Sequence, residues 1–142
     1  MIKLKVEWGE YPGWVILQVN DPPEGKRISC SWVSDVPTDL LGAALVLSHG
    51  DGRVKIGCTD ERRGYEVTLI RRSSRVTIRV KSEGKNRYEA EEDFSAVIMQ
   101  VVSGIEQMMT TKGSPERYEA FWRHRFPATQ IAGLKAVFPN ET

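Results

Sequence analysis

The first part of the chain alternates apolar and polar residues with a period of two, the pattern of half-buried β-strands. The stretch "MIKLKVEW" (residues 1–8) has its apolar side chains on one face and its charged side chains on the other. "WVILQVN" (14–20) is apolar on both faces and predicts a more central strand, whereas "KRISCSWVS" (26–34) places Cys30 and Trp32 on one face. Turns rich in proline and glycine separate these three predicted strands.

The period then changes to that of a helix. "VPTDLLGAALVLS" predicts a helix over residues 38–48 that is apolar around most of its circumference, with Thr38 as the N-cap. The next stretch, "SHGDG" (48–52), resembles the loop of a hydrolase, but Gly50 stands where helices commonly close with a left-handed glycine. The Asp-Gly dipeptide is typical of a tight turn, and His49 is favourably placed against the helix dipole. We therefore interpret the stretch as a helix cap and a turn.

The second half begins with strands and ends with helices. "RVKIGC" (53–58) predicts a strand, and residues 65–94 predict three antiparallel strands joined by turns at "RRSSR" and "SEGKN", the second of five residues. An apolar stripe at helical spacing predicts a long helix over 94–110. Two more helices are expected within 114–126 and 128–138, the first with a serine N-cap and a proline at its first position.

These elements define an α+β fold. We expect one domain over residues 1–142, mainly an antiparallel sheet of six or seven strands. One helix would be inserted after the third strand, and the C-terminal helices would pack on one face of the sheet.

Basic residues recur in the region 65–94 and could form a nucleic-acid patch. Pairing the strands instead places the basic middle strand beside acidic neighbours. The predicted cross-strand pairs are Arg72 with Arg75, Thr68 with Arg79, Glu66 with Lys81, Arg79 with Glu89, Thr77 with Glu91 and Arg75 with Asp93. This face also lacks aromatic residues on which bases could stack. We interpret it as a solvated, charge-paired surface and expect no nucleic-acid partner.

Composition and charge narrow the classes of protein. The hydrophobic fraction of 40% and the charged fraction of 27% are ordinary for a globular protein, and a net charge of +1 gives little attraction for nucleic acid. No apolar run reaches the roughly 20 residues of a membrane helix, and the N-terminal residues do not form a secretory signal. A cytoplasmic protein without a membrane partner is therefore expected.

The residues that could carry chemistry do not form a recognisable motif. Cys30, Cys58, His49 and His124 are not at close metal-ligand spacing, so we expect two buried structural thiols and no metal site. The sequence contains no glycine-rich phosphate loop and no nucleophile elbow. We expect neither a cofactor nor catalysis.

Two stretches are candidates for contact with a partner protein. "CTDERRG" (58–64) is a charged connection of mixed sign, which could steer and select a partner. "YEAFWRHRF" (118–126) combines aromatic residues with cations; its aromatic residues suit packing, whereas Trp and Arg are also common at binding hot spots. The candidate contact residues are Asp60, Glu61, Arg62, Arg63, Arg123 and His124.

The order of a strand, "SWVSDVPTDLLGAALVL", "RVKIGC", three strands and an apolar helix resembles small bacterial immunity proteins of polymorphic toxin systems. It is most similar to the group typified by wall-associated-protein immunity proteins. The resemblance covers roughly residues 25–110 and leaves the helices from Ser114 onward unmatched. It implies a non-catalytic protein that neutralises a toxin domain by binding it.

Two other classes stay open. A general accessory or interaction module would have the same sequence features but would bind a partner of another kind. A small enzyme could use residues scattered along the chain, and a pocket that unites His49 or His124 with a carboxylate would favour it.

Overall fold

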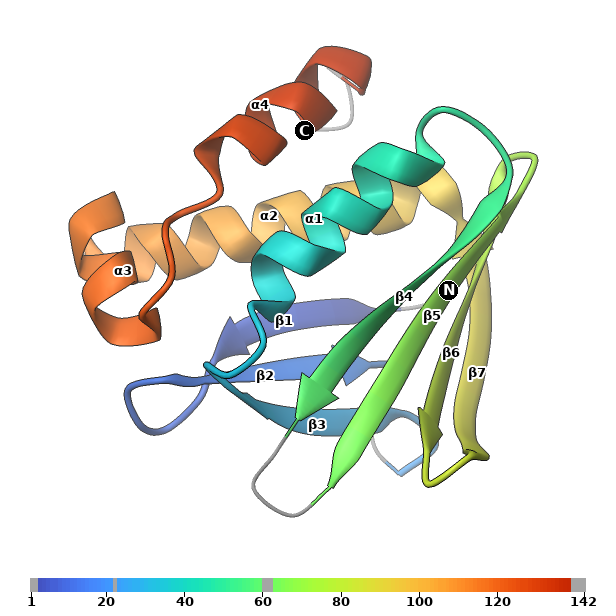
Figure 1. The fold of residues 1–142 in the computed structure, drawn as a ribbon. Coiled ribbons are helices and arrows are strands. Elements are labelled where there is room, and N and C mark those ends of the chain that lie inside the picture. The colour runs from blue at the N-terminus through green and yellow to red at the C-terminus, as the bar shows by residue number, and fades with distance from the viewer. Residues whose placement is uncertain (1–2, 22, 60–62, 139–142) are drawn as a thin grey trace.

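The computed structural model describes residues 3–21, 23–59 and 63–138, which form seven strands and four helices (Figure 1). In chain order they are β1 (Leu4–Trp8), β2 (Trp14–Val19), β3 (Lys26–Ser31), α1 (Val36–Leu47), β4 (Gly52–Thr59), β5 (Gly64–Arg72), β6 (Arg75–Ser82), β7 (Lys85–Asp93), α2 (Phe94–Lys112), α3 (Pro115–Trp122) and α4 (Ala128–Val137). The α+β class is confirmed. No helix among the described residues is both long and apolar enough to cross a membrane.

The strands form two antiparallel sheets, so the prediction of a single sheet of six or seven strands is wrong. One sheet has the order β1-β2-β3 and the other β4-β5-β6-β7. The helix α1 is not inserted into one sheet but connects the two, and β3 contacts β4 without hydrogen-bonded pairing (Figure 1). Alternation specifies which face of each strand is buried, but it does not specify whether strands on either side of a helix pair with each other.

The apolar faces of both sheets and the stripes of the helices meet in one core. Val15, Leu17 and Val19 of β2, which is central in its sheet as predicted, are fully buried. The helix α2 lies along the outer edge of β1, and its Gly104 comes close to Val6. A Cβ atom at Gly104 would be 3.0 Å from Cγ1 and 3.2 Å from the carbonyl oxygen of Val6. The helix therefore covers a strand edge that would otherwise be open to pairing.

Helix α1 begins two residues earlier than predicted. Asp35, not Thr38, is the N-cap: its Oδ1 accepts a hydrogen bond from the backbone N–H of Thr38 at 3.4 Å. Pro37 stands in the first turn, where the N–H that proline lacks would have no partner within the helix.

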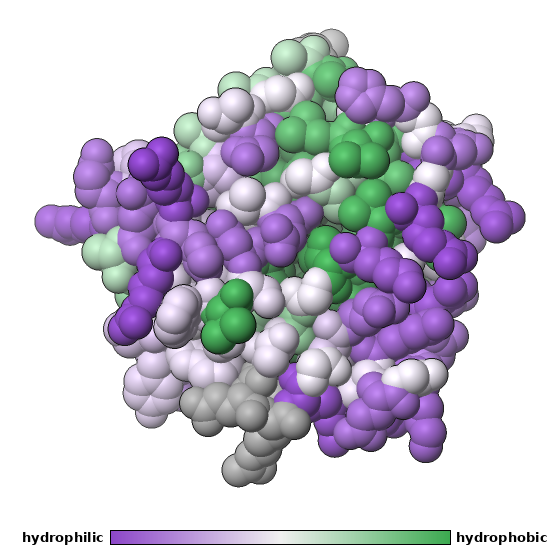
Figure 2. All heavy atoms as spheres, viewed as in Figure 1, coloured by the Kyte–Doolittle hydropathy of each residue, from purple (hydrophilic) through white to green (hydrophobic). Residues whose placement is uncertain are grey.

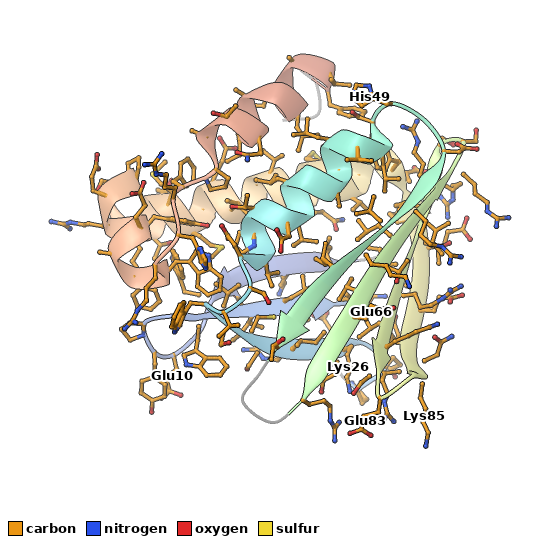
Figure 3. The ribbon with its side chains drawn as sticks, in the orientation of Figure 1. Glu10, Lys26, His49, Glu66, Glu83 and Lys85 are labelled. Carbon is orange, nitrogen blue, oxygen red and sulfur yellow. The ribbon has the colours of Figure 1, made fainter. Side chains whose placement is uncertain are left out.

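The interpretation of "SHGDG" as a cap and a turn agrees with the structure. The N–H of Gly50 donates to the carbonyl of Leu47 at 3.2 Å, and Gly50 has a φ of 149°, a conformation that L side chains rarely adopt. The Oδ1 of Asp51 accepts a hydrogen bond from the N–H of Ser73 at 2.7 Å, which ties this turn to the β5–β6 turn. His49 is exposed at the end of α1 (Figure 3).

Gly50→Val should lower the free energy of unfolding by about 1 kcal/mol or more because valine is strained at positive φ. Nothing lies within 4 Å of a Cβ atom at this position, so the cost comes from the backbone alone. Urea denaturation measures the loss, with His49→Ala as the neighbouring control, expected within about 0.5 kcal/mol of the parent. Loss of function in folded His49→Ala would contradict the interpretation of this loop as structural.

The predicted pairing of β5, β6 and β7 is confirmed. Thr68 pairs with Arg79, which also pairs with Glu89, and Arg75 pairs with Arg72 on one side and Asp93 on the other. The predicted five-residue turn is wrong, because β6 and β7 join through the two residues Glu83 and Gly84, both at positive φ. A β-bulge at Val80/Lys81 shifts the register, and beyond it the strands pair as predicted.

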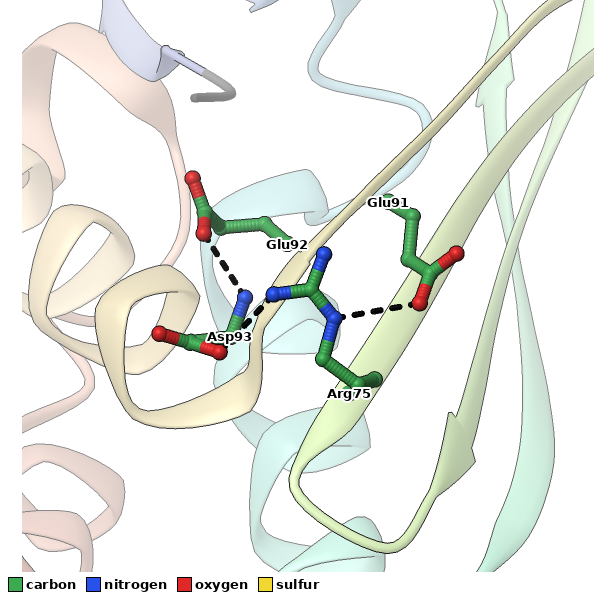
Figure 4. A network of polar contacts seen from close by, with 4 residues as sticks. All are labelled: Arg75, Glu91, Glu92 and Asp93. Carbon is green, nitrogen blue, oxygen red and sulfur yellow. Dashed lines mark hydrogen bonds and ion pairs between the residues drawn. The ribbon is translucent and has the colours of Figure 1, made fainter.

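Ion pairs neutralise much of the basic strand β6. The Nε of Arg75 lies 3.0 Å from Oε1 of Glu91 and its Nη1 lies 2.9 Å from Oδ1 of Asp93 (Figure 4). The Nε of Arg79 lies 2.7 Å from Oε1 of Glu89. These arginines are engaged by carboxylates of the same sheet. The charge-paired interpretation of this face is confirmed.

Candidate interaction surface

Exposed apolar side chains gather at one end of the molecule. The large apolar residues that are exposed in the described part of the chain are Tyr11, Trp32, Val33, Val46, Met99 and Val137. Three of these, Tyr11 (64% exposed), Trp32 (44%) and Val33 (69%), belong to the β1–β2 turn and the β3–α1 connection. Figure 2 shows green and pale spheres at the lower left, where these loops lie, and mainly purple spheres at the right over β6 and β7.

We use the name aromatic tip for the surface formed by Tyr11, Trp32, Val33, Arg123 and His124. The prediction that Trp32 shares the apolar face of its strand is wrong, because β3 ends at Ser31 and the indole emerges at the surface.

Backbone hydrogen bonds join three segments at the aromatic tip. The N–H of Trp32 donates to the carbonyl of Gly13 at 2.8 Å, and the N–H of Gly13 donates to the carbonyl of Phe121 at 2.7 Å. Gly13 has a φ of 84°, and a Cβ atom there would lie 2.9 Å from Cδ1 of Trp32. Only glycine permits both this turn and this approach of the indole, so the β1–β2 turn, the β3–α1 connection and the end of α3 form one unit.

A polar group beneath the surface connects α1 to the segment after α3. The Oδ1 of Asp35 accepts a hydrogen bond from Nε1 of buried Trp122 at 2.9 Å, in addition to capping α1. The Nε2 of His124 lies 2.5 Å from the carbonyl oxygen of Trp32, and its Nδ1 lies 3.8 Å from Oδ2 of Asp35. Since a carbonyl oxygen only accepts, Nε2 of His124 is the donor in its contact.

The structure thus places His124 beside a carboxylate, whereas the observation that would favour an enzyme is a pocket that unites the two. Both ring nitrogens of His124 face acceptors of the same chain, whereas a general base needs a nitrogen directed at a substrate. A cavity of about 550 Å³ adjoins the aromatic tip on the outer face of the three-stranded sheet, lined by residues that include Tyr11, Trp14 and Arg27. Neither His124 nor Asp35 lines this cavity. The pair serves to hold the loops together.

Buried aromatic residues support the aromatic tip from below. Tyr118 and Trp122 are fully buried, which confirms the packing interpretation of these two residues. The Tyr118 ring lies 5.1 Å from the ring of Trp8 and 5.1 Å from that of Phe126. Burial, with a smaller effect of the Asp35 charge, raises the pKa of Tyr118 far above its usual range. The phenol therefore stays neutral, in keeping with a role in packing.

Acidic groups cluster at the first turn of α1. Burial raises the pKa of Asp39, the charge of Asp35 raises it further, and the charge of His124 opposes the increase.

Arg123 adds a cation at the surface. It ends α3 in the left-handed conformation with a φ of 76°, and its guanidinium lies 5.3 Å from the centroid of the Trp32 ring. This distance is within the range of a cation–π interaction. Arg123 is exposed, and no carboxylate of the described residues forms an ion pair with it.

Of the three predicted contact residues that the structure describes, two belong to the aromatic tip. Arg123 and His124 lie there, whereas the Nε of Arg63 is 3.7 Å from Oε1 of Glu83 at the β6–β7 turn. Figure 3 places Glu83 at the lower right and Glu10, beside the aromatic tip, at the lower left. The other predicted residues, Asp60, Glu61 and Arg62, lie outside the described residues.

Tyr11, Trp32 and Val33 were not predicted from the sequence as contact residues. The signal for Tyr11 was its place in "GEYPG", a turn in which an aromatic side chain has no strand face to pack on. The signal for Trp32 and Val33 was Asp35 with Pro37 two residues later, a helix start that leaves little room for the strand to continue.

Comparisons of the chain with models of protein families, with characterised proteins and with solved structures found no match. Among the described residues, no group of three or more His, Cys, Asp or Glu side chains is arranged to hold a metal ion.

Proposed function

We propose that this protein is a non-catalytic binding domain that holds one protein partner through the aromatic tip. The observation that carries the proposal is the exposure of Trp32, Tyr11 and Val33 on loops that are fixed to one another, with Arg123 against the ring of Trp32. Trp, Tyr and Arg are the residues most enriched among binding hot spots. Loops that are already ordered lose less conformational entropy when a partner binds.

The specific form of the proposal is an immunity protein that neutralises a cognate toxin domain by forming a tight complex. Its support is the order of elements over residues 25–110, which resembles immunity proteins. Trp32 and Val33 lie within that stretch, whereas Arg123 and His124 lie beyond it, so the C-terminal helices would add contacts particular to this chain. A general accessory module would use the same surface for a partner that is not a toxin.

Affinity capture from the native cell with mass spectrometry tests the proposal. We expect one protein at near-stoichiometric yield. Expression of the toxic domain of that partner alone should arrest growth, and co-expression of this chain should restore growth. Capture of nucleic acid or a metabolite without a protein partner would contradict the binding function. A partner that is not toxic would contradict the immunity function and favour the accessory module.

Two matched substitutions test whether the aromatic tip is the contact surface. Val33→Lys should weaken the affinity for the captured partner about 30-fold or more, because it places a flexible cation in an apolar contact, a loss of the size seen at hot spots. Val46→Lys is the control, since Val46 is similarly exposed (61%) but lies near the far end of α1. Calorimetric titration gives both affinities. Equal affinities for the two variants would place the contact elsewhere.

A further inference from the structure

The strand β7 forms an open edge of the four-stranded sheet. It pairs with β6 on one side, and its only other extensive neighbour among the described residues is α2, which follows it directly in the chain (Figure 1). The other outer strands are covered, because α2 lies along β1 and the strands β3 and β4 contact each other. An open edge presents backbone N–H and C=O groups that can pair with another strand.

Alternate residues of β7 direct their backbone groups away from β6. The N–H of Phe94 donates to the carbonyl of Ser74 at 2.7 Å, so every second residue before Phe94 faces β6 as far as the bulge. The residues between them, Glu89, Glu91 and Asp93, face the open side. The N–H of Asp93 donates to the side chain of the residue before it at 2.8 Å, which closes that end of the edge (Figure 4). The backbone groups of Glu89 and Glu91 remain available for pairing.

The charges of β7 are arranged so that the strand complements itself. Its first part carries Lys85 and Arg87, and its second part carries Glu89, Glu91 and Asp93, all of them exposed. Two such strands can pair antiparallel with Glu89 at the centre. Lys85 of each copy then lies opposite Asp93 of the other, and Arg87 lies opposite Glu91.

This alignment avoids the like-charge contacts that neighbouring alignments would create. Centring the pair one residue later places Glu89 opposite Glu91, and centring it one residue earlier places Glu83 of the turn opposite Asp93. In the favoured alignment two copies of Glu89 meet at the centre. The Nε of Arg79 lies 2.7 Å from Oε1 of Glu89 and compensates that charge within each chain.

We propose that a second copy of this chain pairs with the open edge of β7, antiparallel and centred on Glu89. The two sheets would then form one continuous sheet across a two-fold axis, with the same surface used by both copies. Charges on an edge discourage pairing with foreign strands, whereas here the same charges favour a copy of the chain in one alignment.

The pairing is expected to be weak and to leave the aromatic tip free. The bulge makes Arg87 an extra residue and twists the strand there, so the backbone ladder is short and ion pairs contribute much of the selectivity. Exposed ion pairs are screened by salt. Since β7 lies on the side of the molecule away from the aromatic tip, each dimer would present two such tips (Figures 1 and 2).

Sedimentation velocity of the full chain over a concentration series tests the pairing, and it needs no other partner. In about 50 mM salt we expect monomers at about 5 µM and a clear dimer fraction at about 500 µM, which about 0.5 M salt should dissociate. A parent chain that stays monomeric throughout the series, or a dimer that is insensitive to salt, would overturn the proposal.

Two charge reversals and their mixture test the alignment. Arg87→Glu and Glu91→Arg should each raise the dissociation constant of the dimer about tenfold or more, because each reversal places like charges opposite each other on both sides of the two-fold axis. An equimolar mixture of the two variants should dimerise about as tightly as the parent, since opposite charges face each other again.

Arg53→Glu is the matched control. Arg53 is exposed on β4, at the other edge of the same sheet, so its reversal changes the net charge equally and should leave the dissociation constant within about twofold. Circular dichroism verifies that the variants fold, and the concentration series of the parent decides the matter if one does not. A mixture that stays monomeric, or an equal effect of Arg53→Glu, would refute pairing through β7.

Discussion

Val101→Asp is expected to unfold the protein at neutral pH. Val101 is buried (2% exposed) on the apolar stripe of α2, the helix that contacts β1, both neighbouring helices of the C-terminal half, and α1. An unpaired carboxylate buried at that position costs several kcal/mol, which is comparable with the whole free energy of unfolding of a domain this size. Circular dichroism and urea denaturation should show a largely unfolded chain.

The control for this prediction lies on the same helix. Ser103 is two residues further along α2 and exposed, so Ser103→Asp should leave the free energy of unfolding within about 0.5 kcal/mol of the parent. A cooperative melt of Val101→Asp near that of the parent would contradict the position of α2 in the core.

The elements with strong periodicity were predictable from the sequence. The register of β5, β6 and β7 could be derived because opposite charges had to meet across strands, as Arg79 and Glu89 do. The predicted register is correct although the predicted turn is wrong, because the bulge at Val80/Lys81 compensates for the shorter connection. Charge pairing between strands therefore predicted the register more reliably than the predicted length of the turn did.

The division into two sheets could not be predicted. The strands β3 and β4 each show one apolar face, and that pattern is the same whether they pair side by side in one sheet or contact each other from two sheets. The choice depends on how α1 packs, which involves contacts distant in sequence. The buried face of each strand could therefore be predicted from the sequence, but the strands that pair with β3 and β4 could not.

The aromatic tip was predicted only in part for a related reason. Arg123 and His124 could be identified because a cation next to Trp is typical of binding surfaces. Their neighbours Tyr11 and Trp32 are about ninety or more residues away along the chain, and only the folded structure brings them together. The residue that organises this meeting, Asp35, looks like an ordinary helix cap in the sequence.

Asp35→Ala should lower the free energy of unfolding by about 2–4 kcal/mol, the sum expected for a lost N-cap and an unsatisfied buried N–H. The Oδ1 of Asp35 accepts from the N–H of Thr38 and from Nε1 of Trp122, which is fully buried and would be left without its acceptor. His124 would also lose the carboxylate near its Nδ1. Asp35→Asn keeps an amide oxygen for the cap and the indole, so it should cost less than about 1 kcal/mol.

Urea denaturation of both variants measures the difference in the free energy of unfolding. A nitrogen chemical shift of the Trp122 indole that changes in Asp35→Ala but not in Asp35→Asn would locate the cause of that difference. If Asp35→Ala and Asp35→Asn had the same free energy of unfolding, neither the N-cap nor the indole hydrogen bond would hold α1 and α3 in place beneath the aromatic tip.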